Sequence, residues 1–318
     1  MTATFQLIGR RLLQLPVMVL GITFLVFVVM SFSKVDPAIT ALGESSSIED
    51  RQAYRDALGL DDPLLVRYIA FLGGLLQGDL GTYSARQLPV LEEVARAFPI
   101  TIQLTFLGLL IAVIGATVLG ITAAVFRDRW PDQLIRLVSI ASLSTPSFWL
   151  AVLLIQLFTL QLSVLPASGA LPPLTEDPGG WLARMALPAL ALAVPVVGQL
   201  SRVVRSAMVE ELDRDYVRTA LGAGVPRVIV IGRNVLRNAL ITPVTVLGLR
   251  IGYLIGGAVV IEIIFALPGM GTLILNGVTN NEPNLVQGVT LVVALAFVVI
   301  NVVVDLLYVL INPRIRSV

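Results

Sequence analysis

The side chains that could do chemistry in this chain of 318 residues are limited by the absence of histidine and cysteine. Without histidine there is no HExxH zinc motif, Ser-His-Asp triad or histidine metal ligand. Without cysteine there is no disulfide, thiol nucleophile or cysteine metal site. The one lysine, Lys34, lies in no GxxxxGK[ST] sequence, so the chain has no Walker A loop for ATP. A membrane-embedded enzyme would therefore lack obvious catalytic groups.

The remaining candidates are polar residues within apolar runs, where an ionisable group is costly and marks a functional hypothesis. Arg250 lies mid-run and could meet a solute carboxylate, Glu262 or backbone carbonyls; the alternatives are a structural pair or a snorkelling arginine. For Glu262 an acid at the membrane interface is the favoured interpretation. Gln103 and Gln199 either line a polar solute path or form hydrogen bonds between helices.

The elements that must position these residues are indicated by composition. Hydrophobic residues make up 56% and charged residues 14%, and the mean hydropathy is +0.89. A soluble domain has about 25% charged residues, so an ordinary soluble protein and a disordered one are both excluded. The net charge of +1 gives no sign of a nucleic-acid partner. The composition is typical of an all-α, multi-pass integral membrane protein.

About 20 apolar residues cross a bilayer as a helix, and the sequence predicts six such spans. The third span is interrupted at "STPSF", where Pro146 predicts a kink. The spans are predicted at residues 12–32, 100–126, 134–164, 185–204, 239–265 and 285–311.

Arginine placement predicts that both termini are cytoplasmic. Most arginines fall in segments that this orientation places inside, and the two short outer segments hold only Arg184. The predicted organisation is a first helix (1–33), an extracytoplasmic segment with short helices (34–96), a five-helix core (97–311) and a cytoplasmic tail (312–318). Within the core, the Pro/Gly-rich segment 165–183 is predicted to be an irregular outer loop.

The long cytoplasmic segment 205–238 is the most informative part of the sequence. Residues 210–221 predict a polar helix, which Gly222 and Gly224 end because glycine accepts the left-handed conformation of a helix stop. Pro226 suits the first turn of a second helix. A short helix between two spans can enter a groove on a partner protein, whereas a plain connecting loop is the alternative.

The sequence "DYVRTALGAGVP", followed by "LRNALITPV", resembles the EAA-type signature of binding-protein-dependent ABC importer permeases. It is most similar to the dipeptide/oligopeptide/nickel group of this family. The matching residues are Asp215, Tyr216, Val217, Arg218, Thr219, Ala220, Gly224, Leu236, Arg237, Asn238, Ala239, Leu240 and Pro243.

Three further stretches, at 58–83, 261–275 and 304–316, resemble the same group, so the resemblance covers nearly the whole chain. Two departures are visible. Gly222 and Ala223 stand where the group usually has Ala and Lys, and Thr242 is inserted before Pro243. The first departure removes a lysine that could contact the ATPase.

The resemblance implies the type I (MetI-like) ABC importer fold and a set of partners. These are a second homologous permease, two cytoplasmic ATP-binding domains and an extracytoplasmic solute-binding protein, in the bacterial cytoplasmic (inner) membrane. ATP and Mg²⁺ would bind to the ATPase subunits, so this chain would have no cofactor, metal site or catalytic residue. The residues implied to couple to the ATPase are Asp215, Tyr216, Val217, Arg218, Thr219, Ala220, Leu221, Gly224 and Arg227.

The group's solutes leave alternatives open. We expect di- or oligopeptides, but nickel, an opine or another small solute fits the same fold. An ion-coupled secondary transporter is a different class, which commonly shows inverted repeats and carboxylates at mid-membrane depth. Neither feature is apparent in this sequence.

Overall fold

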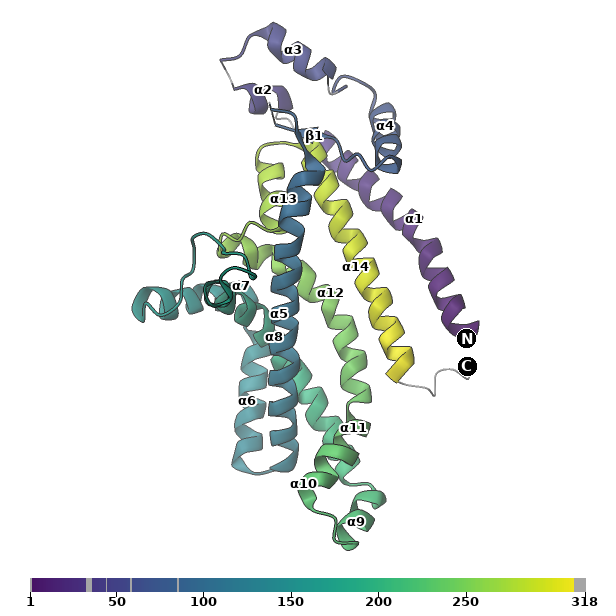
Figure 1. Cartoon of the computed structure of the whole chain (residues 1–318), viewed down its shortest axis with the longest axis vertical. Helices are drawn as coiled ribbons and strands as arrows, with labels where there is room; N and C mark the ends of the chain where they lie inside the picture. The colour runs from purple at the N-terminus through teal and green to yellow at the C-terminus, as the bar shows by residue number, and fades with distance from the viewer. Residues whose placement is uncertain (1, 33–35, 44, 58, 85, 312–318) are drawn as a thin grey trace. The chain divides into compact units, whose positions relative to one another are not determined.

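The computed structural model describes residues 2–32, 36–43, 45–57, 59–84 and 86–311, with side chains in these ranges except at 2–15, 40, 249 and 304–311. The predicted tail 312–318 and Lys34 lie outside the described residues. The described chain is mostly helical (Figure 1). Its strands there are a two-residue antiparallel pair, β1 (Thr82–Tyr83) and β2 (Leu88–Pro89).

The chain forms two compact units. The first comprises Met1–Thr101 and Leu267–Val299, and the second comprises Ile102–Ala266 and Ile300–Val318. The second unit contains most of α5 (Val90–Val125), together with α6 (Trp130–Ser144), α7 (Ser147–Leu154), π-helix η1 (Ile155–Gln161), α8 (Pro178–Leu212), α9 (Asp215–Gly222), α10 (Arg227–Ile229), π-helix η2 (Val230–Val235), α11 (Leu236–Ala239) and α12 (Ile241–Ile264).

Helix α8 is the central helix of the second unit, and it packs against α6, α7 and α12. In its most apolar window 56% of the residues are buried inside the protein, against 33% for α5, although α8 is the less hydrophobic helix. Pro188 and Pro195 both lie buried within it. Neighbouring helices can compensate for the hydrogen bonds that such prolines remove, so these residues do not prevent a continuous helix.

Glycines of α5 allow that helix to approach α8 closely. A Cβ added at Gly120 would lie 2.5 Å from the Cβ of Val204, and one at Gly115 would lie 3.2 Å from a methyl group of Val197. Real Cβ atoms do not approach as closely as the first of these distances. Small residues at helix contacts let backbones pack directly against one another in membranes. The glycines of α5 therefore fix its position against α8.

The predicted kink at Pro146 is wrong in degree, because the chain turns through 104° between α6 and the helix formed by α7 and η1. Pro146 lacks an N–H group and disfavours helical geometry in the preceding residue. Thr145 accordingly has an extended backbone (φ −90°, ψ 118°). Residues 134–164 are therefore two helical segments rather than one kinked helix.

Three described helices are long and apolar enough to cross a membrane, or up to five if each bent pair counts as one span. The three are Val90–Val125, Pro178–Leu212 and Pro283–Val303. Of the first predicted span, Pro16–Ser31 forms a shorter apolar helix. Six spans and two cytoplasmic termini therefore stay predictions. The helix that contains the second predicted span is longer than that span, since α5 begins at Val90 and includes Pro99.

The first unit contains the helices predicted for the segment 34–96. Ser47 stands directly before α3 (Ile48–Ala57) and accepts a hydrogen bond from the Asp50 amide at 3.0 Å, so it caps the start of this helix. Tyr68 on α4 donates to the Leu20 carbonyl at 2.8 Å and so joins α4 to α1. The helices of this unit are α1 (Thr2–Ser31), α2 (Pro37–Leu42), α3 (Ile48–Ala57), α4 (Leu64–Leu76), α13 (Met270–Thr279) and the start of α14 (Pro283–Ile311).

Candidate functional site

Helix α9 begins directly after the end of α8. Residues 210–212 belong to α8, so the predicted start of the polar helix at Glu210 is wrong. Arg214, in an extended conformation (φ −70°, ψ 148°), separates the two helices and is the N-cap of α9. Asp215 opens α9, where an acidic side chain is favourable next to the positive end of the helix dipole. α9 is therefore joined to α8 by a connection of only two residues, Asp213 and Arg214.

The end of α9 is fixed by Gly224. The amide of Gly224 donates to the Leu221 carbonyl at 3.0 Å, and the amide of Val225 donates to the Ala220 carbonyl at 3.1 Å. These two bonds form a Schellman motif, which needs a left-handed residue. Gly224 has φ +81°, which confirms its predicted role, whereas Gly222 is still helical. Only the second glycine makes the stop.

One face of α9 packs into its own subunit. Val217 is buried in an apolar cluster with residues of α5, α8 and η2, and Tyr216 and Ala220 pack against that cluster. The Tyr216 hydroxyl donates to a Glu211 carboxylate oxygen at 2.8 Å. Burial of the ring raises the pKa of Tyr216. We call the side chains of residues 216, 217 and 220 the inner face of α9; they anchor the helix.

The opposite face of α9 is open. Arg218 and Thr219 are exposed, and Arg218 pairs loosely with Asp215, at 3.5 Å. Leu221, one helical turn after Val217, and Arg227, at the start of α10, are exposed as well but lie on the side of Val217. We call the side chains of residues 218 and 219 the outer face of α9. The structure thus divides the predicted coupling residues into an anchoring set and an accessible set.

The segment after Gly224 returns the chain to the membrane. Pro226 is the N-cap of α10, so a helix starts close to the predicted position. The turn of π-helix in η2 follows, a feature frequent at functional sites. Asn238 then donates to the Tyr216 hydroxyl at 3.4 Å, so the two matching parts of the signature meet. Pro243 lies in the first turn of α12, where proline is tolerated, and this position accommodates the inserted Thr242.

A cavity of about 300 Å³ lies beneath α9. Its walls are mostly apolar, and Val217 and Leu221 close it on the α9 side. Charged side chains stand at three places in the lining. The lining residues are Ala124, Val125, Arg127, Val209, Leu212, Asp213, Val217, Leu221, Arg227, Val230 and Ile231. Part of α9 therefore borders a cavity rather than packed side chains.

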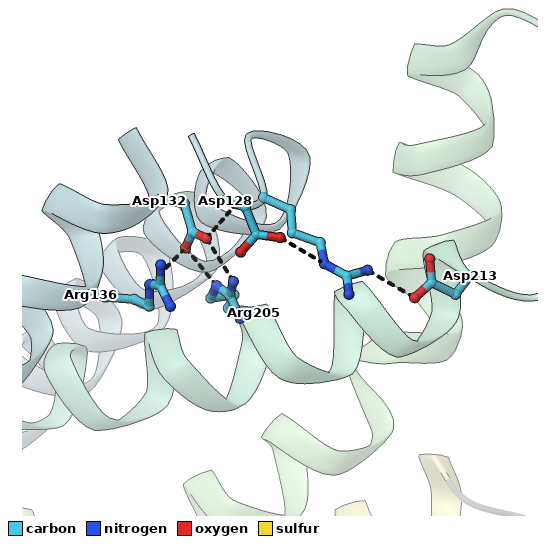
Figure 2. A network of polar contacts seen from close by, with 6 residues as sticks. Asp128, Asp132, Arg136, Arg205 and Asp213 are labelled. Atoms are coloured by element: carbon cyan, nitrogen blue, oxygen red, sulfur yellow. Dashed lines mark hydrogen bonds and ion pairs between the residues drawn. The ribbon is translucent and has the colours of Figure 1, made fainter. Parts of the chain in front are cut away.

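An ionic network joins the turn between α5 and α6 to α8 (Figure 2). Asp132, which is fully buried, accepts from Arg205 Nε at 2.6 Å and from Arg205 Nη2 at 2.7 Å. It also accepts from the Asp128 amide at 2.9 Å. Arg136 approaches the same carboxylate to 3.6 Å. A bidentate arginine–carboxylate pair is among the stronger and more directional polar contacts.

A second pair in the network lies at the end of α8. Arg127 Nη1 donates to Asp213 Oδ2 at 2.9 Å, and both side chains are about half exposed. Exposed pairs contribute only about 0–1 kcal/mol. The sequence did not predict this network, since Arg205 and Arg127 counted only as inner-side charges. The acids Asp128 and Asp132 in an otherwise basic short loop were the feature that could have indicated ion pairs. Nothing in the sequence identified their partners.

The candidate solute-path residues lie on three helices, α5, α8 and α12. The Arg250 guanidinium lies 6.0 Å from the ring centre of Tyr253, a cation–π distance. Glu262 is fully buried on the same helix, but twelve residues of helix put it about 18 Å from Arg250, so the two do not pair. Gln103 accepts from the Trp181 indole at 2.8 Å, and Gln199 is half-buried on α8.

Arg184 has a structural position that the sequence did not predict. Its side chain is buried and donates to the carbonyls of Ala167 at 2.6 Å and Phe265 at 2.5 Å. It thereby ties the irregular segment before α8 to the end of α12; the predicted irregular segment 165–183 is too long, because α8 begins at Pro178. The carbonyls at a helix end carry partial negative charge, which suits a cation.

Comparison with known proteins supports the permease resemblance. The profile of the family described as "Binding-protein-dependent transport system inner membrane component" matches residues 116–317. The profile of its N-terminal region matches residues 4–105. Together the two profiles account for most of the chain and include α9.

Several curated relatives match over nearly their full length. One from Brucella abortus (strain 2308), named as a candidate peptide transport system permease protein, is 40% identical over 98% of both chains. The Escherichia coli (strain K12) protein named as the probable D,D-dipeptide transport system permease DdpB is 39% identical, over 98% of this chain and 97% of its own. The glutathione transport system permease GsiC of Salmonella paratyphi A is 38% identical, over 96% and 97%. The chain belongs to the family of binding-protein-dependent transport system inner membrane components.

Proposed function

We propose that this chain is one of two membrane subunits of an ATP-driven importer of short peptides. Membership of the family implies an inner-membrane permease that works with ATPase and solute-binding partners. The second, homologous permease is part of the proposal, as are two ATP-binding domains below and the binding protein above. The polar residues that line the solute path are not assigned. The candidates are Arg250, Glu262, Gln103 and Gln199.

The observation that carries the coupling role is the division of α9 into two faces. The inner face is buried against the apolar cluster, and the outer face exposes Arg218 and Thr219. A short helix held in this way can transmit force from a partner that grips its outer face. Because the chain lacks a Walker A lysine, the nucleotide chemistry belongs to the ATPase partners.

The peptide part of the proposal is supported by the relatives' names, two of which specify D,D-dipeptides and glutathione. Both solutes are short peptides or peptide derivatives. The experiment is uptake into proteoliposomes that hold the complete transporter, with radiolabelled di- and tripeptides competing against Ni²⁺ and an opine. Saturable peptide uptake that neither competitor reduces supports the proposal. Uptake of Ni²⁺ or the opine, with no peptide uptake, overturns it.

A further inference from the structure

Helix α6 is fastened to α8 at points spread along their shared length, from Asp132 near the turn to Ser139 two helical turns later. We propose that α6 and α8 move as one rigid lever driven by α9, with Asp132 and Arg205 as its positioning pair. This inference rests on the proposed function, since it states how force applied to α9 reaches the next membrane segment.

The polar contacts between α6 and α8 run antiparallel along the two helices. Asp132 pairs with Arg205, and seven residues further along α6 the Ser139 hydroxyl hydrogen-bonds that of Ser201 at 2.9 Å. Seven residues are two helical turns, so Asp132 and Ser139 lie on the same face of α6. On α8, Ser201 stands one turn before Arg205. Both polar contacts are therefore made by one face of each helix.

Beyond the serine pair the two backbones are in direct contact. A Cβ added at Gly198 would lie 2.7 Å from the Ser139 carbonyl oxygen and 2.8 Å from the Ser142 Cβ. No other residue type fits there without moving one helix. Gly198 therefore sets the close spacing of the two helices at this point.

The turn that leads into α6 is organised by the same carboxylate. Asp128 has φ +62°, and its amide donates to Asp132, so the buried acid holds the turn as well as the helix. The residue before it, Arg127, reaches Asp213 at the end of α8. Asp213 precedes α9 by two positions. A displacement of α9 thus acts on the end of α8 and, through these pairs, on the turn before α6.

The Asp132–Arg205 ion pair opposes sliding of α6 along α8. A shift of α6 along α8 by one helical turn, about 5.4 Å, would part Asp132 from both Arg205 nitrogens. The fully buried carboxylate would then lack its main counter-charge, which is strongly unfavourable. Serine pairs and glycine contacts alone would not set so large a barrier. The ion pair therefore fixes the register, and the glycine fixes the spacing.

The natural absence of cysteine permits a direct test by cross-linking. The double variant S139C/S201C places two thiols where hydroxyls now lie 2.9 Å apart, close enough for a disulfide after small adjustment. The assembled transporter is assayed in the oxidised and the reduced form. The assay measures uptake of the di- or tripeptide that its binding protein binds most tightly. We expect the oxidised form to retain at least about half of the reduced form's uptake, because a rigid lever is not impaired by a bond within it. Oxidised uptake below half, recovered on reduction, overturns the proposal.

A second variant keeps the test decisive if the double-cysteine protein does not assemble. D132N keeps a hydrogen-bond acceptor for Arg205 but removes the charge. E210Q is the matched control, since Glu210 is exposed on α8 and pairs with Arg214 one turn away rather than with another helix. The number of peptides taken up per ATP hydrolysed is measured on the complex purified in assembled form. A merely structural role of Asp132 would leave this ratio unchanged.

We expect this ratio to fall roughly fivefold or more in D132N and to stay at the wild-type value in E210Q. An unchanged ratio in D132N overturns the proposal. Failure of the proposed function would look different, since the wild-type transporter itself would then take up no peptide.

Discussion

The fully buried Asp132 carboxylate receives both the Nε and Nη2 groups of Arg205, a residue 73 positions later in the chain, at 2.6 and 2.7 Å. This pair is a direct polar link between the α6 segment and the helix that carries α9. It is also the point where a localised change should have the largest structural effect.

Asp132→Ala should destabilise the second unit. The substitution leaves the Arg205 guanidinium, which is only 19% exposed, without its acceptor, and breaking a buried pair costs about 3–5 kcal/mol. The melting temperature of the purified chain in detergent measures the effect. Arg96→Gln is the control, because Arg96 makes only exposed pairs within α5, and it should melt like the wild type. Equal melting temperatures of D132A and the wild type would contradict the claim that the Asp132–Arg205 pair stabilises this unit.

Gly224→Val should abolish the stimulation of ATP hydrolysis by peptide-loaded binding protein. A β-branched residue at φ +81° is strained by about 1–2 kcal/mol or more, so the Schellman stop and the outer face of α9 are displaced. Membrane insertion should be normal. Gly222→Ala is the matched control, since that position is helical and has no heavy atom within 4 Å of an added Cβ. Wild-type stimulation of ATP hydrolysis in G224V would contradict the claim that coupling requires the end of α9 to be fixed by Gly224.

The two faces of α9 should respond differently to substitution. Arg218→Ala alters an exposed residue of the outer face, so stimulated ATP hydrolysis should fall roughly tenfold with no change in melting temperature. Val217→Asp places a charge in the apolar cluster and should cost at least about 2 kcal/mol of stability. Parallel ATPase and melting assays separate these effects. Loss of stability in R218A, with ATPase stimulation intact, would reverse the assignment of the faces.

Glu282, between α13 and α14, should make the first unit sensitive to pH. Burial raises the pKa of its carboxyl, although the Ser84 amide donates to it at 3.1 Å. A folded-state pKa above the unfolded value gives stability that is complete at low pH and is lost as pH rises through the folded pKa. Glu282→Gln removes this dependence, so the melting temperature of E282Q relative to wild type should increase between about pH 4 and about pH 8. A constant difference across that range would contradict the raised pKa.

The sequence predicted the features of the site that depend on local chemistry. Gly224 could be assigned as a helix stop because few other residues adopt a positive φ at low cost. The polar helix predicted over residues 210–221 overlaps α9 at residues 215–221, although its first residues belong to α8.

Other features could not be predicted because they depend on contacts between distant segments. Nothing near Asp132 identifies Arg205 as its partner, and only the packing of α6 on α8 brings them together. Pro146 marks an interruption, but the angle of 104° depends on what the following helix packs against. Likewise, Arg250 and Glu262 look like possible partners in the sequence, whereas one straight stretch of helix keeps them about 18 Å apart.

In the proposed transporter, ATPase subunits drive solute movement through this chain by way of α9. The most direct test is peptide uptake into proteoliposomes that contain the chain, its homologous permease, the ATPase subunits and the binding protein, compared with proteoliposomes that lack only the ATPases. We expect uptake that requires ATP and falls to background without the ATPases. Peptide uptake driven by an ion gradient in the absence of the ATPases would contradict it.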